Sequence, residues 1–290
     1  MQKLLKIIFL SSVLISTSMA EIKVVDDSGK DVILNAPAKR IISLAPHTTE
    51  LLFTAGAEKK LIGVVDYSNY PQAAKKLPSV GSGYLLDIEK ILSLEPDLIV
   101  GWKSGNQSAQ LMQLRNLGLN LYLSEPRSLE DVAENLRSLG LLIGNEKQAN
   151  KLADDYLSKI EALKYKYKGA KPVRVFYQVW QQPLFTVNSE HIISHVIELC
   201  GGVNIFAELK VLSPQIDIES VISRNPEVIV AGAGETREDW LQNWQNWPSI
   251  KAVNDNQLYG IDADLIVRHT TRILQGANLM CEALQKAREH

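Results

Sequence analysis

The sequence predicts an α/β protein built from two Rossmann-like lobes that a single long helix joins. Three observations predict this fold: short apolar runs alternate with amphipathic stretches, one stretch almost lacks strand signal, and one helix–strand unit occurs twice. Such alternation is typical of parallel sheets covered by helices. We expect an N-terminal lobe over 21–127, a helical linker over 128–170 and a C-terminal lobe over 171–290.

Residues 1–20 have the features of a signal peptide. Two lysines precede an apolar run over 7–15, and Ser18-Met19-Ala20 has the small residues of a signal peptidase site. The apolar run is too short to span a bilayer core of about 30 Å as a helix. We therefore expect a soluble protein that functions outside the cytoplasm and begins near Glu21.

The linker is predicted to be helical because residues 128–168 contain mainly helix formers. Ser128 and Asp131 fit an N-terminal cap, and 146–168 contains neither Gly nor Pro. Apolar residues follow one helical face at spacings of four, four and three: Leu152, Tyr156, Ile160 and Leu163. A helix of this length measures about 34 Å. We interpret it as a spacer between lobes; an ordinary surface helix within one domain is the alternative.

An internal repeat supports two related lobes. Residues 87–100 and 217–230 both begin with Asp-Ile-Glu, and seven of the fourteen aligned positions are identical. Each copy predicts a short helix, a proline break and a buried strand. The copies lie on opposite sides of the predicted long helix, so each lobe receives one copy.

Composition and motifs exclude several classes of function. Lys and Arg number 31 against 33 Asp and Glu, and no basic run would suit a phosphate backbone, so we expect no nucleic-acid partner. The chain has no Gly-x-Ser-x-Gly elbow, phosphate loop or His-Glu-x-x-His motif, which argues against an enzyme. His191 and His195 could pair on zinc or manganese, but His47 and His269 do not obviously converge with them. We therefore expect no metal site, and a metal-capture protein remains an alternative.

Cys200 and Cys281 are the two cysteines of the chain. An even pair in an exported protein indicates a disulfide. A metal or redox role is the alternative, and it is less favoured because neither cysteine belongs to a Cys-x-x-Cys motif.

Large aromatic residues follow several predicted strands. Tyr67, Trp102 and Trp180 come at or just after the ends of apolar runs. Ligands of open α/β sheets bind outside the carboxyl ends of the strands, where flat side chains offer stacking surface to a broad ligand. Partly buried packing is the alternative for each. Arg268 could bind a ligand carboxylate or phosphate, or cap a surface. A further stripe of Trp240, Trp244 and Trp247 has helical spacing and is interpreted as packing.

Glu89 and Glu219 occupy equivalent places in the repeat, each in the first turn of a predicted helix. A carboxylate there interacts favourably with the helix dipole and needs no partner. Equivalent placement in two lobes favours a second interpretation, in which paired acidic sites dock on a partner with pseudo-twofold symmetry.

The mature chain resembles the periplasmic binding proteins of cobalamin and iron-siderophore importers. The opening over 37–46, followed by Thr49-Glu50-Leu51, is typical of that family. Four segments are similar to its cobalamin-binding branch, namely 67–71, 101–106, 183–186 and 198–206. The resemblance implies two α/β lobes, a rigid connecting helix, and a disulfide between the two cysteines.

The resemblance also implies roles for single residues. Glu89 and Glu219 match glutamates that dock on arginines of the permease dimer, Tyr67 and Trp102 match ligand-contacting aromatics, and Arg268 matches an arginine at the cleft. The chain departs from the branch where aromatic residues flank the cleft, with Gly83, Val179, Ser213 and Leu265 in those places. Tyr84 and Trp180, one residue away from two of these positions, are expected to substitute.

The resemblance therefore implies a periplasmic, monomeric solute-binding protein that hands cobalamin to an ABC importer, its permease dimer and ATPase subunits. Cobalamin would be the transported ligand, and no cofactor is expected. A haem or ferric-siderophore carrier of the same transporter class is the alternative, with Tyr67, Tyr84 and His269 as candidates for a haem ligand.

Overall fold

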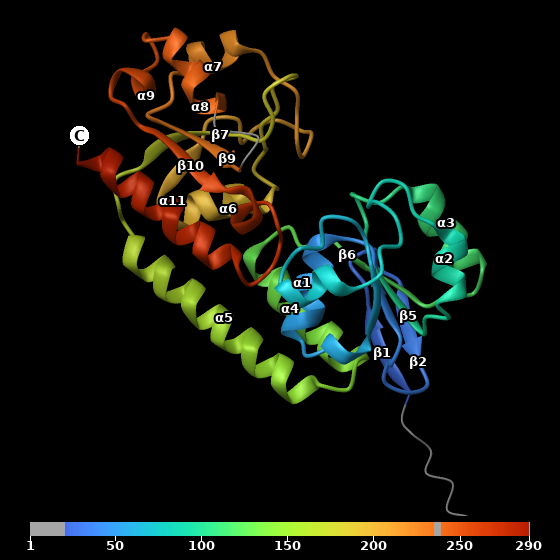
Figure 1. Ribbon diagram of the computed structural model, residues 1–290. Coiled ribbons are helices and arrows are strands. Elements are labelled where there is room, and N and C mark those ends of the chain that lie inside the picture. The colour runs from blue at the N-terminus through green and yellow to red at the C-terminus, as the bar shows by residue number, and fades with distance from the viewer. Residues whose placement is uncertain (1–20, 235–238, 290) are drawn as a thin grey trace, which may run out of the picture.

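A computed structural model describes residues 21–234 and 239–289, arranged as two α/β lobes (Figure 1). The expected signal peptide, residues 1–20, lies outside the described residues. In the N-terminal lobe the elements are β1 (Ile22–Val25), β2 (Asp31–Leu34), β3 (Ile41–Ser43), α1 (Pro46–Thr54), β4 (Leu61–Val64), α2 (Ile88–Ser93), β5 (Leu98–Trp102), α3 (Ser108–Asn116), β6 (Leu121–Ser124) and α4 (Leu129–Leu142). Two 3₁₀ helices, η1 (Glu58–Lys60) and η2 (Gln72–Lys76), flank β4.

The long helix α5 (Glu146–Tyr167) leads into the C-terminal lobe. The elements there are β7 (Val173–Gln178), α6 (Ile192–Leu199), β8 (Gly202–Asn204), α7 (Ile218–Arg224), β9 (Val228–Ala233), α8 (Asp239–Asn243), η3 (Trp244–Asn246), α9 (Lys251–Asn254), β10 (Leu258–Asp262), α10 (Ala263–Ile266) and α11 (Ile273–Arg288). None of the helices in the described ranges is long and apolar enough to cross a membrane.

The two lobes repeat one sheet topology. The N-terminal sheet has the order β4-β3-β5-β6 and the C-terminal sheet the order β10-β9-β7-β8, with every neighbouring pair parallel. Read from the opposite edge, the second sheet has the order of the first. The repeated units occupy equivalent places, since α2 precedes β5 and α7 precedes β9. The predicted two-lobed α/β fold is confirmed.

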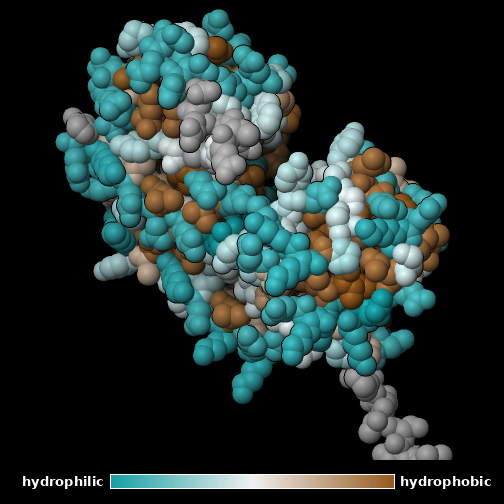
Figure 2. Space-filling model, viewed as in Figure 1, coloured by the Kyte–Doolittle hydropathy of each residue, from teal (hydrophilic) through white to brown (hydrophobic). Residues whose placement is uncertain are grey.

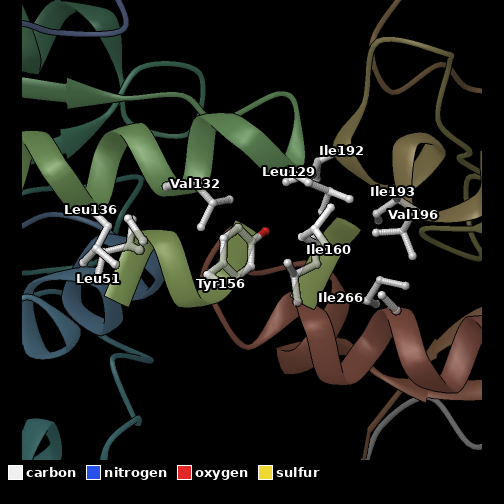
Figure 3. Packing of buried hydrophobic residues seen from close by; sticks show 14 of the residues in the cluster. Leu51, Leu129, Val132, Leu136, Tyr156, Ile160, Ile192, Ile193, Val196 and Ile266 are labelled. Carbon is white, nitrogen blue, oxygen red and sulfur yellow. The ribbon is translucent and has the colours of Figure 1, made fainter. Parts of the chain in front are cut away.

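The connecting helix packs against both lobes. Figure 1 shows α5 running along one side of the molecule from one lobe to the other. Its buried residues Tyr156 and Ile160 belong to a continuous apolar cluster that includes Leu136 of α4 and Ile193 of α6 (Figure 3). Because interiors are close-packed, a core continuous through the helix resists bending between the lobes.

A capping box marks the start of the connecting segment. Ser128 and Asp131 form a reciprocal capping box at the start of α4, as the sequence predicts. Helix α4, which the predicted linker includes, packs against α1 and β1 of the N-terminal lobe as well as against α5. The linker therefore contributes directly to the core of the first lobe.

Cys200 and Cys281 form a disulfide between the end of α6 and the middle of α11, with an S–S distance of 1.98 Å. Both residues are fully buried in the apolar cluster of the C-terminal lobe. The predicted disulfide is confirmed, and it ties the C-terminal helix to the lobe.

Candidate functional site

The lobes meet at the carboxyl ends of their strands. Side chains that follow β3 and β10 contact one another across the boundary, as do segments that follow β4. Figure 2 shows the outline of the molecule indented between the two lobes, away from α5. In parallel α/β sheets this is where ligands bind, so the indentation is the candidate binding cleft.

Three of the predicted aromatic residues are largely exposed. The exposed fractions are 83% for Tyr67, 72% for Tyr84 and 47% for Trp180. Tyr67 has a left-handed backbone, with φ of 65°, and its carbonyl accepts a hydrogen bond from Arg268. Trp180 follows β7, and its ring meets that of Trp240 edge-to-face at 5.3 Å. Exposed aromatic rings therefore occur in both lobes, and Tyr67 and Arg268 contact one another across the boundary between them.

The loop with Tyr84 is attached to the loop after Trp102 by a buried asparagine. The Asn106 amide donates to the carbonyls of Leu44 and Gly83, and its oxygen accepts from the Trp102 backbone. These bonds bring two loops of the N-terminal lobe together at the ends of β3 and β5. The sequence contains Asn106 within a matching segment but gives no sign of this bracing role.

Trp102 is held more tightly than the other three aromatic residues. The backbone of Gly105 lies so close to the indole that an added Cβ would fall 1.9 Å from a ring atom. The indole also meets His47 and His269 edge-to-face. Its Nε1 is buried without a hydrogen-bond partner among residues 21–234 and 239–289. Trp102 therefore offers a ligand only part of its ring.

Arg268 lies in an ionic network between the lobes. Its guanidinium is 2.7 Å from the Glu50 carboxylate and 2.9 Å from that of Asp264. Glu50 is only 2% exposed, and it also accepts from Arg272 at 2.9 Å and from Thr270 at 3.2 Å. A ligand anion at Arg268 would have to compete with these carboxylates.

Glu50 joins the N-terminal lobe to the C-terminal lobe, a role that sequence reasoning missed. It lies on α1, whereas all three of its partners come from the segment between β10 and α11. The Arg272 guanidinium also stacks on the ring of Tyr70, 3.7 Å from its centroid. The segment carrying Tyr67 and Tyr70 is thus positioned by the opposite lobe.

Three histidines come together beneath this network, contrary to the expectation that His47 and His269 do not converge with His191. The ring of His269 lies 5.9 Å from that of His47 and 5.7 Å from that of His191. Burial lowers the pKa of His191 to about 3, that of His269 to about 4, and that of His47 well below its usual value. All three are therefore neutral near pH 7. The convergence could not be read from their separate positions in the chain.

His191 and His195 have different surroundings. No group of three or more His, Cys, Asp or Glu within the described ranges is placed to hold a metal ion. His191 caps the start of α6 by accepting from the backbone of Ile193, and His195 borders a hollow on the α5 side.

Glu89 and Glu219 are both exposed in the first turns of their helices. The preceding aspartates cap these helices, Asp87 accepting from the Lys90 backbone and Asp217 from that of Ser220. The caps satisfy helix N–H groups without the two glutamates, which have no hydrogen-bond or ion-pair partner among the described residues. Both helices lie on the side of the molecule away from α5 (Figure 1).

A hollow of about 660 Å³ lies on the α5 side of the molecule, where residues of α4, α5, α6 and β8 line it. It contains none of the predicted site residues. Glu130, Glu161 and Lys164 line it together with apolar groups, and Lys164 already pairs with Glu161. Size alone does not make this hollow the binding site.

Comparisons with known proteins agree with the two-lobed architecture. The model of the periplasmic binding protein family matches residues 41–265. The chain therefore belongs to the periplasmic binding protein family.

Two named relatives define the similarity more closely. The vitamin B12-binding protein of Vibrio cholerae serotype O1 is 38% identical over 257 residues, 87% of this chain and 91% of that protein. The vitamin B12-binding protein of Yersinia pestis is 36% identical over 247 residues, 85% of this chain and 86% of that protein.

Solved structures extend the comparison to three dimensions. The crystal structure of the periplasmic vitamin B12-binding protein BtuF of Vibrio cholerae matches with a TM-score of 0.82, covering 88% of this chain and 99% of that chain at 38% identity. The periplasmic haem-binding protein RhuT from Roseiflexus has the same fold, with a TM-score of 0.77 over 87% of this chain, at 22% identity.

Proposed function

We propose that the protein captures a corrinoid, cobalamin, between its lobes in the periplasm and delivers it to the permease dimer of an ABC importer. The observation that carries this proposal is the similarity to vitamin B12-binding proteins along almost the whole chain, at 38% identity. It is a carrier and not an enzyme, because the proposed chemistry is binding and release.

Exposed aromatic rings support a broad, flat ligand. Tyr67 follows β4 and Tyr84 lies in the loop before α2 in the N-terminal lobe, while Trp180 follows β7 in the C-terminal lobe, and all three are exposed. Such rings bury large apolar areas on a flat macrocycle while their polar edges reach its amide groups. We infer that Trp102 adds an edge contact, and that Arg268 binds a ligand oxygen while Glu50 keeps its guanidinium oriented.

Tyr84 and Trp180 take the place of aromatic residues that the chain lacks at Gly83 and Val179. The backbone of Gly83 is fixed by Asn106, so the neighbouring Tyr84 is presented from an anchored loop. Trp180 is supported by its contact with Trp240 and by the hydrogen bond from its Nε1 to the Gln182 carbonyl. The Trp180 ring and the loop that carries Tyr84 are thus positioned before a ligand arrives.

The equivalent exposed glutamates support docking on a two-fold transporter. Glu89 and Glu219 follow identical capping aspartates in lobes of identical sheet order. A permease dimer that presents two cationic sites would meet both carboxylates at once, which steers encounter and fixes orientation. ATP hydrolysis by the ATPase subunits would then drive transfer of the ligand.

Titration calorimetry with cobalamin, cobinamide and haem tests the ligand. We expect saturable binding of the two corrinoids, and corrinoid absorption bands in protein purified from cells supplied with cobalamin. A Soret band, or tighter binding of haem than of either corrinoid, would replace the proposal with the haem-carrier alternative.

The Glu89→Arg and Glu219→Arg double variant tests docking separately. Uptake of cobalamin should be lost while calorimetric binding is retained, because both residues lie outside the proposed cleft. Glu58→Arg, an exposed glutamate in η1, is the matched control and should support normal uptake. Normal transport by the double variant would refute the docking role.

A further inference from the structure

Three histidines lie together at the boundary between the lobes. His47 belongs to α1 of the N-terminal lobe, whereas His191 caps α6 and His269 lies between β10 and α11 in the C-terminal lobe. The His269 ring lies 5.9 Å from that of His47 and 5.7 Å from that of His191. The contact between His47 and His269 therefore crosses from one lobe to the other, and we refer to the three residues as the histidine cluster.

The two rings that meet across the boundary are buried, since His47 is 4% exposed and His269 is 8% exposed. Burial, the His269 ring and then the Arg268 guanidinium lower the pKa of His47. Burial also lowers the pKa of His269 to about 4, although a hydrogen bond to the Pro126 carbonyl acts in the opposite direction. The Nε2 atom of His47 lies 3.2 Å from the Ser124 hydroxyl. The closed boundary therefore holds both rings in their neutral form near pH 7.

His191 completes the cluster from the start of α6. Burial and the nearby His269 lower the pKa of His191 to about 3. His195 on the same helix and Arg127 after β6 act in the same direction. Arg127 itself pairs with Glu190 at 3.3 Å, and this pair also crosses the boundary. A proton on His191 would therefore face the Arg127 guanidinium of the first lobe.

The carboxylates of adjoining elements are already paired. Glu50 on α1 accepts from Arg268 at 2.7 Å, and Asp264 on α10 pairs with the same guanidinium at 2.9 Å. Glu125, which follows β6, accepts from the backbone and hydroxyl of Ser104, both at 2.9 Å. Because these contacts engage their oxygens, the three carboxylates do not compensate a new charge on the histidine cluster. Protonation there is unfavourable as long as the lobes stay in contact.

Separating the lobes would expose these rings to water, where a histidine has its ordinary pKa of about 6.5. Below that pH the open arrangement binds protons that the closed arrangement excludes, so protons shift the equilibrium toward the open arrangement. The pKa of His269 is about 4 in the closed arrangement. For this residue a change from about pH 7.5 to about pH 5 raises the ratio of open to closed protein about 25-fold. At higher pH the rings are neutral in both arrangements and the bias disappears.

We propose that the histidine cluster is an acid-sensitive contact that separates the lobes and releases the ligand of the cleft at low pH. Trp102 carries the change into the cleft, because its indole meets His47 at 5.3 Å and His269 at 6.3 Å between ring centroids. The apolar core around α5, on the side of the molecule away from the indentation, stays packed while the boundary opens (Figure 1). Release of the ligand rests on the proposed function, whereas separation of the lobes does not depend on it.

Energy transfer between two fluorescent labels measures the separation of the lobes in ligand-free protein. Met112→Cys in α3 and Val211→Cys between β8 and α7 introduce the label sites, and both positions are 62% exposed. Transfer should fall reversibly as the pH is lowered from about 7.5 to about 5, while the far-UV circular dichroism stays unchanged. A fall in transfer without loss of secondary structure would show that the boundary opens before the lobes unfold.

His269→Phe, made in the labelled protein, assigns the effect to the cluster. Phenylalanine keeps a buried aromatic ring that binds no proton, so transfer should fall less and at lower pH than in the parent protein. Glu58→Gln, which removes an exposed carboxyl in η1, is the matched control and should follow the parent protein. If circular dichroism shows that His269→Phe is not folded, His191→Asn takes its place, since asparagine retains the helix cap but does not titrate.

Calorimetric titration with cobalamin tests release of the ligand. Affinity should weaken about tenfold or more between about pH 7.5 and about pH 5, and it should weaken less in His269→Phe. Unchanged affinity in protein whose lobes separate would overturn the release. If cobalamin binds at neither pH, the proposed function fails, and the labels in ligand-free protein still decide whether the lobes separate.

Two results in the ligand-free protein would overturn the proposal. In the first, energy transfer stays constant with falling pH until the circular dichroism of the fold is lost, so that the lobes separate only by unfolding. In the second, the histidine variant has the same pH profile of transfer as Glu58→Gln, so that another group governs the opening.

Discussion

The carboxylate of Glu50 on α1 lies 2.7 Å from the guanidinium of Arg268 in the opposite lobe, and both side chains are largely removed from solvent. Arg272 approaches the same carboxylate at 2.9 Å. The ion pair crosses the boundary between the lobes at the carboxyl ends of their strands. Removing both charges from water costs free energy that the attraction between them largely offsets, so the pair adds little net stability. We infer that its role is to favour one arrangement of the two lobes over others.

Glu50→Gln should destabilise the protein and loosen the boundary between lobes. Removing the Glu50 charge leaves two largely buried arginines with only the more exposed carboxylate of Asp264 beside Arg268, at a cost of about 3 kcal/mol. Urea unfolding should show this loss, and hydrogen exchange should rise near Tyr67 and Tyr70. Glu58→Gln, exposed in η1, should change stability by less than about 0.5 kcal/mol. Equal stability of the two variants would contradict the role assigned to Glu50.

Stability should fall as the pH drops below about 6.5, the pKa of an unfolded histidine. Burial lowers the pKa of His269 to about 4 and that of His191 to about 3, so the folded state favours the neutral rings. Their contribution is complete above pH 6.5 and is lost progressively between pH 6.5 and about 3. For His269 alone the difference is about 3 kcal/mol.

A variant at His269 distinguishes protonation of the buried histidines from other causes of unfolding at low pH. His269→Phe keeps an aromatic ring beside Trp102 and His47 but cannot gain a proton, so the profile of unfolding free energy against pH should become flatter between pH 4 and 6.5. An unchanged slope in His269→Phe would show that the cluster does not govern acid stability.

Removing the disulfide should lower the free energy of unfolding by about 4.5 kcal/mol in the chain-entropy model, because the bond closes a loop of 81 residues. The Cys200→Ser and Cys281→Ser double variant, measured by urea unfolding, checks this value. A reductant should destabilise the parent protein and leave the double variant unaffected. A loss below about 1 kcal/mol would indicate that packing of α11 alone holds this part of the lobe.

Gly105→Ala should displace the Trp102 indole. The added Cβ would lie 1.9 Å from the ring, which neither group can accommodate without moving. We expect a change in tryptophan fluorescence and corrinoid binding weakened by about tenfold or more, read by calorimetry. Gly234→Ala, where no atom of residues 21–234 and 239–289 lies within 4 Å of an added Cβ, is the control. Unaltered binding and fluorescence in Gly105→Ala would mean that Trp102 is not part of the cleft.

Periodicity and repetition in the sequence predict the fold well. The apolar run at 98–102 becomes β5, and the Gly- and Pro-free stretch becomes the long helix α5. The Asp-Ile-Glu repeat marks α2 and α7, whose equivalent positions follow from one shared sheet order. These features are local in sequence.

The candidate site is less predictable because its contacts join distant segments. Glu50 and Arg268 are 218 positions apart in the sequence, and His47 and His269, whose rings are also in contact, have a similar separation in sequence. Nothing in the residues around either member identifies the other. The tryptophan stripe, whose members are close in sequence, packs as predicted: Trp240 and Trp244 are buried, and Trp247 packs against the apolar cluster that contains Trp244.

The chain passes from the first sheet to the second only once, through α5. All strands of the N-terminal sheet precede this helix, and all strands of the C-terminal sheet follow it. During synthesis every strand of the first sheet is therefore made before any strand of the second, and each sheet is built from its own contiguous segment. The ion pair between Glu50 and Arg268 can form only after the last part of the chain has been made. Contacts across the boundary between the lobes therefore form late in folding.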